Sequence, residues 1–146
     1  MSEDEYWIDN GWGSGLRSLE HERVVQEQVA EDLLASTDAG RSVALEFILY
    51  KRPPNPLTAY RGVLSEHGIA YRTIALKPAV DEVLRRMEHR GRPRDVRDLE
   101  RRRMEAEHQL RVLESDEVDA DWLIDPTDRT VDDLCRECLA RFDTPA

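Results

Sequence analysis

The sequence predicts an α/β protein, a three-layer fold in which a mostly parallel sheet of three or four strands is flanked by helices. Short β-favouring runs alternate with amphipathic helical segments, and this order favours parallel pairing through crossovers. The clearest such run, Ser42–Ile48 (SVALEFI), suits a strand covered on both faces. No internal repeat or Pro/Gly/Ser linker divides the chain, so residues 1–146 are expected to form a single domain.

The N-terminal half contains two expected helices. Residues 1–17 look largely irregular, apart from a short strand at Tyr6–Ile8 and a glycine-rich loop. Ser18 is suited to cap a helix that runs to about Ser36, and Gly40 follows its end. After a proline-rich loop, a helix is expected from Leu57 to His67, with Gly68 at its C-terminus.

In the second half we expect a strand at Tyr71–Leu76, a helix that begins near Pro78, and a short strand at Asp121–Asp125. Residues 90–114 form an arginine-rich hinge and a long helix from about Val96. Thr130 is suited to cap the closing helix.

Composition excludes several functions. The formal net charge is -10, which argues against duplex DNA and anionic membranes as partners. No apolar run approaches the ~20 residues that span a bilayer, and the acidic N-terminus is unlike a secretory signal, so a cytoplasmic location is expected.

Arginines are concentrated in one segment. Nine lie between residues 85 and 103. Because guanidinium groups pair with phosphate oxygens, Arg90, Arg92 and Arg94, in a Gly-Pro hinge, are expected to bind an anion. Arg101 and Arg102 are better explained by pairing with acids one turn away on a helix. Arg103 interrupts an apolar seam and is expected to face a cleft or a buried acid.

Two acidic residues lie at expected strand ends, where parallel sheets bind ligands. Asp9 follows the Tyr6–Ile8 run, and Glu46 lies within the best predicted strand as a buried charge. Either could accept a substrate proton or help to hold Mg²⁺. The alternatives are a turn role for Asp9 and a salt bridge to Lys51 or Arg52 for Glu46.

The other motifs in the sequence do not indicate a specific function. The loop Gly11–Gly15 lacks the strand and the Lys-Ser/Thr pair of a phosphate-binding loop. Cys135 and Cys138 lie on the apolar stripe of the closing helix and are expected to be core residues. The four histidines are scattered, and no metal site is predicted.

Between Tyr6 and Phe142, the order of these pieces resembles the distal part of a small-molecule P-loop kinase of the shikimate, gluconate and nucleotide kinase type. Tyr6-Trp-Ile-Asp9 looks like a substrate-side strand, Gly40–Glu46 like the third strand, and Thr73–Pro78 with Arg86–Arg94 like a strand, helix and arginine lid. Trp122–Thr127 is similar to the last strand and the adenine-side loop.

The resemblance implies ATP and Mg²⁺ as cofactors and a small-molecule substrate. It implies Asp9, Glu46 and Arg103 as catalytic residues, and Arg90, Arg92, Arg94, Pro126 and Thr127 as nucleotide-binding residues. Nothing matches the family's first strand, phosphate-binding loop and helix, which carry the β- and γ-phosphates. We therefore expect a truncated or degenerate kinase-like domain, and we expect this chain to have no kinase activity.

Two alternatives come from other functional classes. One is a non-catalytic module that binds a phosphorylated anion through its arginines. The other is a protein-interaction module in which a second copy or a partner strand completes the sheet.

Overall fold

The structure is a computed structural model that describes residues 1–12, 18–49, 55–91 and 98–143. The chain forms two compact units, Met1–Tyr71 (unit 1) and Arg72–Ala146 (unit 2). Each is described by itself below. The sequence contains no Pro/Gly/Ser linker at the boundary between the units, so the sequence analysis did not predict this division.

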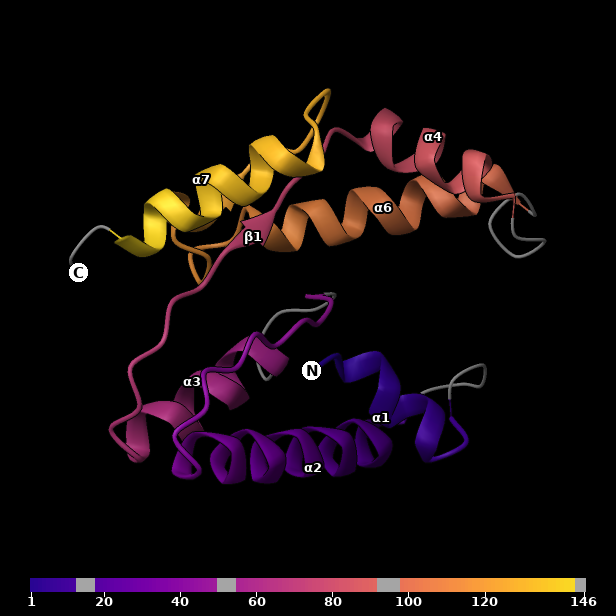
Figure 1. Ribbon diagram of the computed structural model, residues 1–146. Coiled ribbons are helices and arrows are strands. Elements are labelled where there is room, and N and C mark those ends of the chain that lie inside the picture. Colours follow the sequence, from indigo (N-terminus) through magenta and orange to yellow (C-terminus); the bar gives the residue numbers. More distant parts are fainter. Residues whose placement is uncertain (13–17, 50–54, 92–97, 144–146) are drawn as a thin grey trace. The chain divides into compact units, whose positions relative to one another are not determined.

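The described residues of unit 1 contain three helices, α1 (Glu3–Asp9), α2 (Leu19–Asp38) and α3 (Pro56–Glu66). The long helix α2 packs against both α1 and α3 (Figure 1). Four buried side chains form the core between these helices, namely Trp7, Val25, Val29 and Tyr60. Each helix contributes at least one of them, so burial of apolar surface joins all three.

Local signals predicted the helix ends well. The Ser18 hydroxyl accepts a hydrogen bond from the His21 N–H at 3.1 Å, which confirms the expected N-cap of α2. The Asn55 side chain caps α3 in the same way, accepting from the Thr58 N–H at 3.0 Å. Gly40 and Gly68, just beyond the two helices, have φ values of 71° and 65°, which glycine adopts without strain.

The expected strand at Tyr6–Ile8 is wrong, because these residues lie in α1. Three acids occupy the first turn of this helix, where the helix dipole favours negative charge. Trp7 is 1% exposed and joins the core formed with α2 and α3. A helix buries this ring while leaving Ile8 65% exposed, so tertiary packing overrides the β-favouring run.

The segment 42–48 also differs from the prediction. It contains no assigned strand, and its bridge pairs Ser2 with Glu46 in parallel. The Glu3 N–H donates to the Glu46 carbonyl at 2.9 Å, and the Glu46 N–H donates to the Met1 carbonyl at 3.0 Å. The N-terminus therefore occupies this backbone, and the segment is not a central strand.

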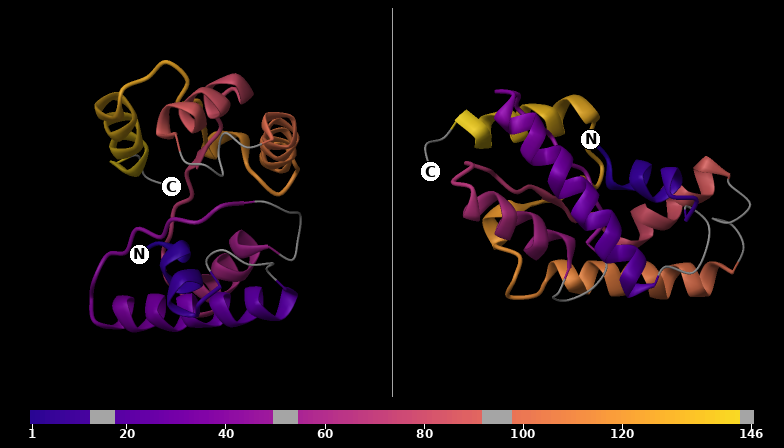
Figure 2. Two further views of the ribbon diagram at one scale, coloured as in Figure 1. Left: turned by 90° about the vertical axis from the view of Figure 1, so that its right-hand side faces the viewer. Right: turned by 90° about the horizontal axis from the view of Figure 1, so that it is seen from below.

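Unit 2 contains β1 (Ala75–Leu76), α4 (Val80–Arg90), α6 (Leu99–Leu113), the 3₁₀ turn η1 (Ala120–Trp122), β2 (Leu123–Ile124) and α7 (Val131–Asp143). The strands pair in parallel, with Ala75 opposite Leu123 and Leu76 opposite Ile124. Helix α4 packs against α6, as the views of Figures 1 and 2 show. The expected strand–helix–strand order is therefore present, with very short strands.

The predicted fold class is wrong. Of the described residues, 63% are helical, and the one sheet among them consists of the two-residue strands β1 and β2. The three-layer sheet of three or four strands fails because Tyr6–Ile8 is helical, and because 42–48 bonds to the N-terminus. Extended backbone forms a sheet only where a partner pairs with it, and propensity does not supply the partner.

The outer face of α7 was also predicted wrongly. Its apolar stripe was expected in the core, but Val131 is 74% exposed and Leu139 is 62% exposed. Cys135 is exposed and Cys138 is partly exposed, so neither is a core residue. The Thr130 cap is confirmed, since its hydroxyl accepts from the Asp133 N–H at 3.2 Å.

Candidate functional site

The carboxyl ends of β1 and β2 form the candidate site in unit 2. Lys77 directly follows β1, and its N–H donates to the Ile124 carbonyl at 2.9 Å. Its ammonium group lies 2.7 Å from a carboxylate oxygen of Glu114, just beyond α6. The hydrogen bond from Lys77 and its positive charge hold the pKa of Glu114 below its ordinary value.

The loop after β2 is bonded to the rest of unit 2. The Thr127 hydroxyl accepts from the Ala79 N–H at 2.9 Å, and so satisfies a backbone donor at the start of α4. Pro126 is fully buried, and its carbonyl accepts from Arg86 Nη2 at 3.1 Å. Both residues were expected to lie beside an adenine ring. In the structure they connect β2 to α4.

A buried carboxylate supports this connection. Glu82 is 7% exposed, and its two oxygens accept hydrogen bonds from Arg85 Nε and Arg86 Nε, each at 2.6 Å. These bonds lower the pKa of Glu82 to about 2. The two guanidinium groups thus stabilise a buried charge of the protein itself.

The outer edge of β2 is covered. The Ile124 carbonyl points toward β1, where it accepts a hydrogen bond from the Lys77 N–H. Because carbonyl directions alternate along an extended chain, the carbonyls of Leu123 and Asp121 point away from β1. The Arg141 guanidinium from α7 bonds to both of these outward carbonyls, at 3.1 Å in the case of Leu123. Glu137 holds Arg141 in place with a carboxylate oxygen at 2.6 Å.

The outer edge of β1 is not covered in this way. Because Lys77 faces β2, the N–H and carbonyl of Leu76 point outward. Within the described parts of the chain these two groups have no hydrogen-bond partner, and the Leu76 side chain is 50% exposed. We call this row the open edge of β1.

A cleft of about 310 Å³ lies at the carboxyl end of β1. Its lining combines the segment after β1 with one face of α6 and comprises Lys77, Pro78, Ala79, Val80, Glu107, Leu110, Arg111 and Glu114. Apolar atoms of Val80 and Leu110 alternate here with two ion pairs, Lys77–Glu114 at 2.7 Å and Arg111–Glu107 at 4.0 Å.

Several arginines of the cluster between residues 85 and 103 pair with acids. Arg103 bonds to Asp81 at 2.8 Å, with both side chains exposed, so the expectation of a cleft or a buried acid is wrong. Arg101 and Arg102 both pair with Glu105, as expected. Arg90 is exposed at the end of α4. The remaining hinge arginines, Arg92 and Arg94, lie outside the described residues.

The two predicted acids belong to unit 1. Asp9 is the exposed last residue of α1, and no strand precedes it there. Glu46 is exposed, and so it is not the buried charge that was expected. Its predicted partners, Lys51 and Arg52, lie outside the described residues.

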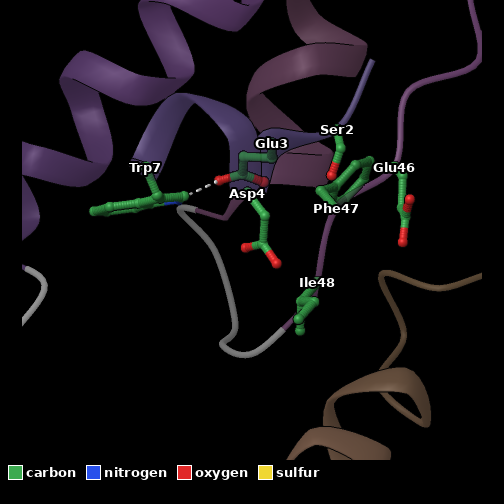
Figure 3. Close-up of a pocket in the computed structure, with 7 residues that line it drawn as sticks. All are labelled: Ser2, Glu3, Asp4, Trp7, Glu46, Phe47 and Ile48. Atoms are coloured by element: carbon green, nitrogen blue, oxygen red, sulfur yellow. Dashed lines mark hydrogen bonds between the residues drawn. The ribbon is translucent and has the colours of Figure 1, made fainter. Parts of the chain in front are cut away.

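Glu46 lines a pocket of about 50 Å³ with residues of α1 and the adjoining segment (Figure 3). The Trp7 indole N–H donates to Glu3 at 3.4 Å, while the carboxylates of Asp4 and Glu46 do not converge on one point. No group of His, Cys, Asp or Glu in the described residues could hold a metal ion. This pocket is far smaller than the ~300 Å³ or more of typical small-molecule sites.

Comparisons with known proteins add no family to this geometry. No protein-family model matches the chain, and neither the curated proteins nor the solved structures contain a match. None of the helices in the described ranges has the length and apolar character needed to cross a membrane.

Sequence reasoning missed the two features that distinguish this site. Arg141 lay in the closing helix with no sign that it reaches the edge of β2, 18 residues away. The strand at Tyr71–Leu76 was predicted, but a sequence does not say which edge of a strand is paired.

Proposed function

We propose that this protein is a non-catalytic interaction module that binds an extended segment of a partner protein along the open edge of β1. The observation that carries the proposal is the outward N–H and carbonyl of Leu76, which lack a partner in the described residues. An unpaired strand edge accepts an added strand through main-chain hydrogen bonds.

The difference between the two edges supports this proposal. Natural proteins protect strand edges against chance pairing by charges, bulges or covering groups. Here Arg141 covers the edge of β2, and no such group lies on Leu76 among the described residues. A sheet with one covered edge, that of β2, and one open edge, that of β1, is suited to bind an added strand at the open edge.

The size of the sheet points the same way. Each strand has two residues, and isolated two-stranded pairs are only marginally stable in water. The three residues of unit 2 before β1, 72–74, lie outside helices and strands, and Ile74 is half-buried. A third strand would extend the pairing into this segment.

Phosphotransfer has less support in the geometry. Thr127 and Pro126 bond to unit 2 itself, and Arg103 forms an exposed ion pair. Anion binding by the hinge arginines Arg90, Arg92 and Arg94 stays a prediction. Five other arginines of the cluster already have carboxylate partners, namely Arg85, Arg86, Arg101, Arg102 and Arg103. Kinase-like activity stays a prediction that an assay of ATP turnover would test.

The proposal can be tested with a peptide that forms an extended strand, acetyl-Thr-Val-Thr-Leu-Thr-Val-Thr-amide, added to the full chain. Binding should shift the amide resonance of Leu76 and slow its hydrogen exchange. Leu76→Pro removes the outward N–H but leaves the Lys77–Ile124 bond, so the fold should persist and binding should be lost.

Leu76→Ala is the matched control, since it keeps the N–H and should retain binding of the peptide. Unchanged binding by Leu76→Pro would contradict the proposal. So would a Leu76 amide that is already protected in the free monomer, because the edge would then be occupied.

A further inference from the structure

We infer that the exposed apolar face of α7 is a self-association surface, against which α7 of a second copy of this chain packs in the antiparallel direction. The surface consists of Val131, Cys135, Leu139 and Phe142, and we call it the α7 stripe. The inference does not depend on the proposed function, because it uses the outer face of α7 and not the open edge of β1.

The α7 stripe is a continuous apolar surface. Val131 and Leu139 are the most exposed of its side chains, Phe142 is 46% exposed, and Cys135 is exposed as well. The four residues are spaced by four, four and three positions, so they lie along one side of the helix. Arg141, which covers the edge of β2, lies on a different side. Contiguous exposed apolar surface of this kind is typical of an interaction site.

The packing of unit 2 leaves this face uncovered. In the described ranges, α4 packs closely against α6, while α7 has no comparable contact with another helix (Figure 1). Burial against a second helix would remove the apolar side chains of the stripe from water, which is favourable.

The charges beside the stripe are self-complementary. Asp132 and Arg136 lie on the same flank of it, one helical turn apart. In an antiparallel pair of α7 helices with the two copies of Cys135 at the two-fold axis, Val131 meets Leu139 of the second copy. Asp132 then lies beside Arg136 of the second copy, and the symmetry repeats each contact.

The same charges select one register of the pair. A shift of the second helix by one turn would place Asp132 beside Asp132 of the second copy, or Arg136 beside Arg136, according to its direction. Like charges in such positions are destabilising. Within one chain Arg136 binds Asp133 at 2.6 Å, but its side chain is 76% exposed, and a guanidinium group has five donors with which to bind a second acid.

The size of the surface predicts a weak dimer. Helix α7 has 13 residues and is therefore about 20 Å long. A pair of such helices buries less than the roughly 1,200 Å² of a standard interface. We expect a reversible dimer with a dissociation constant on the order of 0.1 mM.

Sedimentation equilibrium of the full chain up to about 1 mM tests the dimer. The wild type should pass from monomer to dimer as its concentration rises. Leu139→Asp should stay monomeric, because pairing would bury its charge. The matched control is Met104→Asp, an equally exposed apolar position on α6, which should associate like the wild type. A wild type that is monomeric at 1 mM, or a Leu139→Asp variant that still associates, would overturn the inference.

Exchange of the two charges tests the register. Asp132→Arg places arginines side by side and should weaken the dimer about tenfold. The double variant Asp132→Arg with Arg136→Asp restores opposite charges and should recover the wild-type association. If the double variant is as weak as the single one, the antiparallel arrangement is wrong.

The two cysteines provide an independent test of the same geometry. In Cys138→Ser, oxidation with copper–phenanthroline should link the two copies of Cys135 into a covalent dimer, and the addition of Leu139→Asp should prevent this. Cys135→Ser, which keeps Cys138, is the matched control and should give little covalent dimer. Equal yields from Cys138→Ser and Cys135→Ser would contradict the placement of Cys135 at the two-fold axis.

Discussion

Different interactions stabilise the interior of each of the two units. Unit 1 relies on apolar burial, with Trp7, Val25 and Val29 at 0–1% exposure between helices. Unit 2 contains the denser polar network, in which Glu82 and Glu137 each bind two arginines. Its buried apolar side chains are smaller on average, and include Ala106 and Val112.

This difference indicates where binding can occur. Within each helix of unit 1, the interior N–H and carbonyl groups bond to one another, so packing of helices leaves unpaired backbone groups only at the helix ends. A short strand pair satisfies only one edge of each strand, so the other edges need a side chain or a partner. In the described residues of unit 2, Arg141 covers the outer edge of β2, and no side chain bonds to the outward groups of Leu76.

The largest effect is expected in the core of unit 1. Trp7→Ala removes the largest fully buried side chain and should lower the free energy of unfolding by about 3–5 kcal/mol. Hydrogen exchange of α2 amides would report the loss, with Ile8→Ala, an exposed neighbour, as the control. Equal loss of protection in α6 would break the comparison, since the units would then unfold together.

A smaller, pH-dependent effect is expected in unit 2. The folded-state pKa of Glu82 is about 2, below its ordinary 4.5, so its charge stabilises the fold above pH 4.5. That contribution is lost as the pH falls from about 4.5 toward 2. Glu82→Gln should therefore be less stable than wild type at pH 7, and the urea midpoints should converge near pH 2.

A constant difference between the two midpoints across this range would show that the Arg85 and Arg86 bonds do not depend on the Glu82 charge.

The smallest effect is expected at Arg103. This residue and Asp81 are exposed at 49% and 84%, so Arg103→Ala should change the free energy of unfolding by less than about 0.5 kcal/mol. Denaturant unfolding of the variant would measure this change. If Arg103→Ala lowered the free energy of unfolding by about 2 kcal/mol or more, the result would favour the predicted environment of Arg103, a cleft or a buried acid, over an exposed ion pair.

The sequence predicted those parts of the fold that depend on near neighbours. Ser18 and Thr130 cap the helices that were expected to begin there, and Gly40 and Gly68 lie just beyond two helix ends. The Arg101 and Arg102 pairs were also predicted, because a helix brings residues three and four apart together.

The candidate site could be predicted only in part. The strand that ends at Leu76, just before Lys77, was predicted, while Glu46 was expected to be buried and Arg103 to face a cleft or a buried acid, and both side chains are exposed. The resemblance to kinases assigned roles to Pro126 and Thr127 from their order in the chain. Their observed partners, Arg86 and Ala79, lie 40 and 48 residues away.

The amino-acid sequence alone determined most of the helices and where they begin, since capping, glycine conformation and helical pairing act over a few residues. Tertiary structure decided that Tyr6–Ile8 is helical, that 42–48 bonds to the N-terminus, and that Arg141 closes one edge of a two-stranded sheet. The physical reason is that strand pairing and burial join residues far apart in the chain, and local preference does not specify which of them meet.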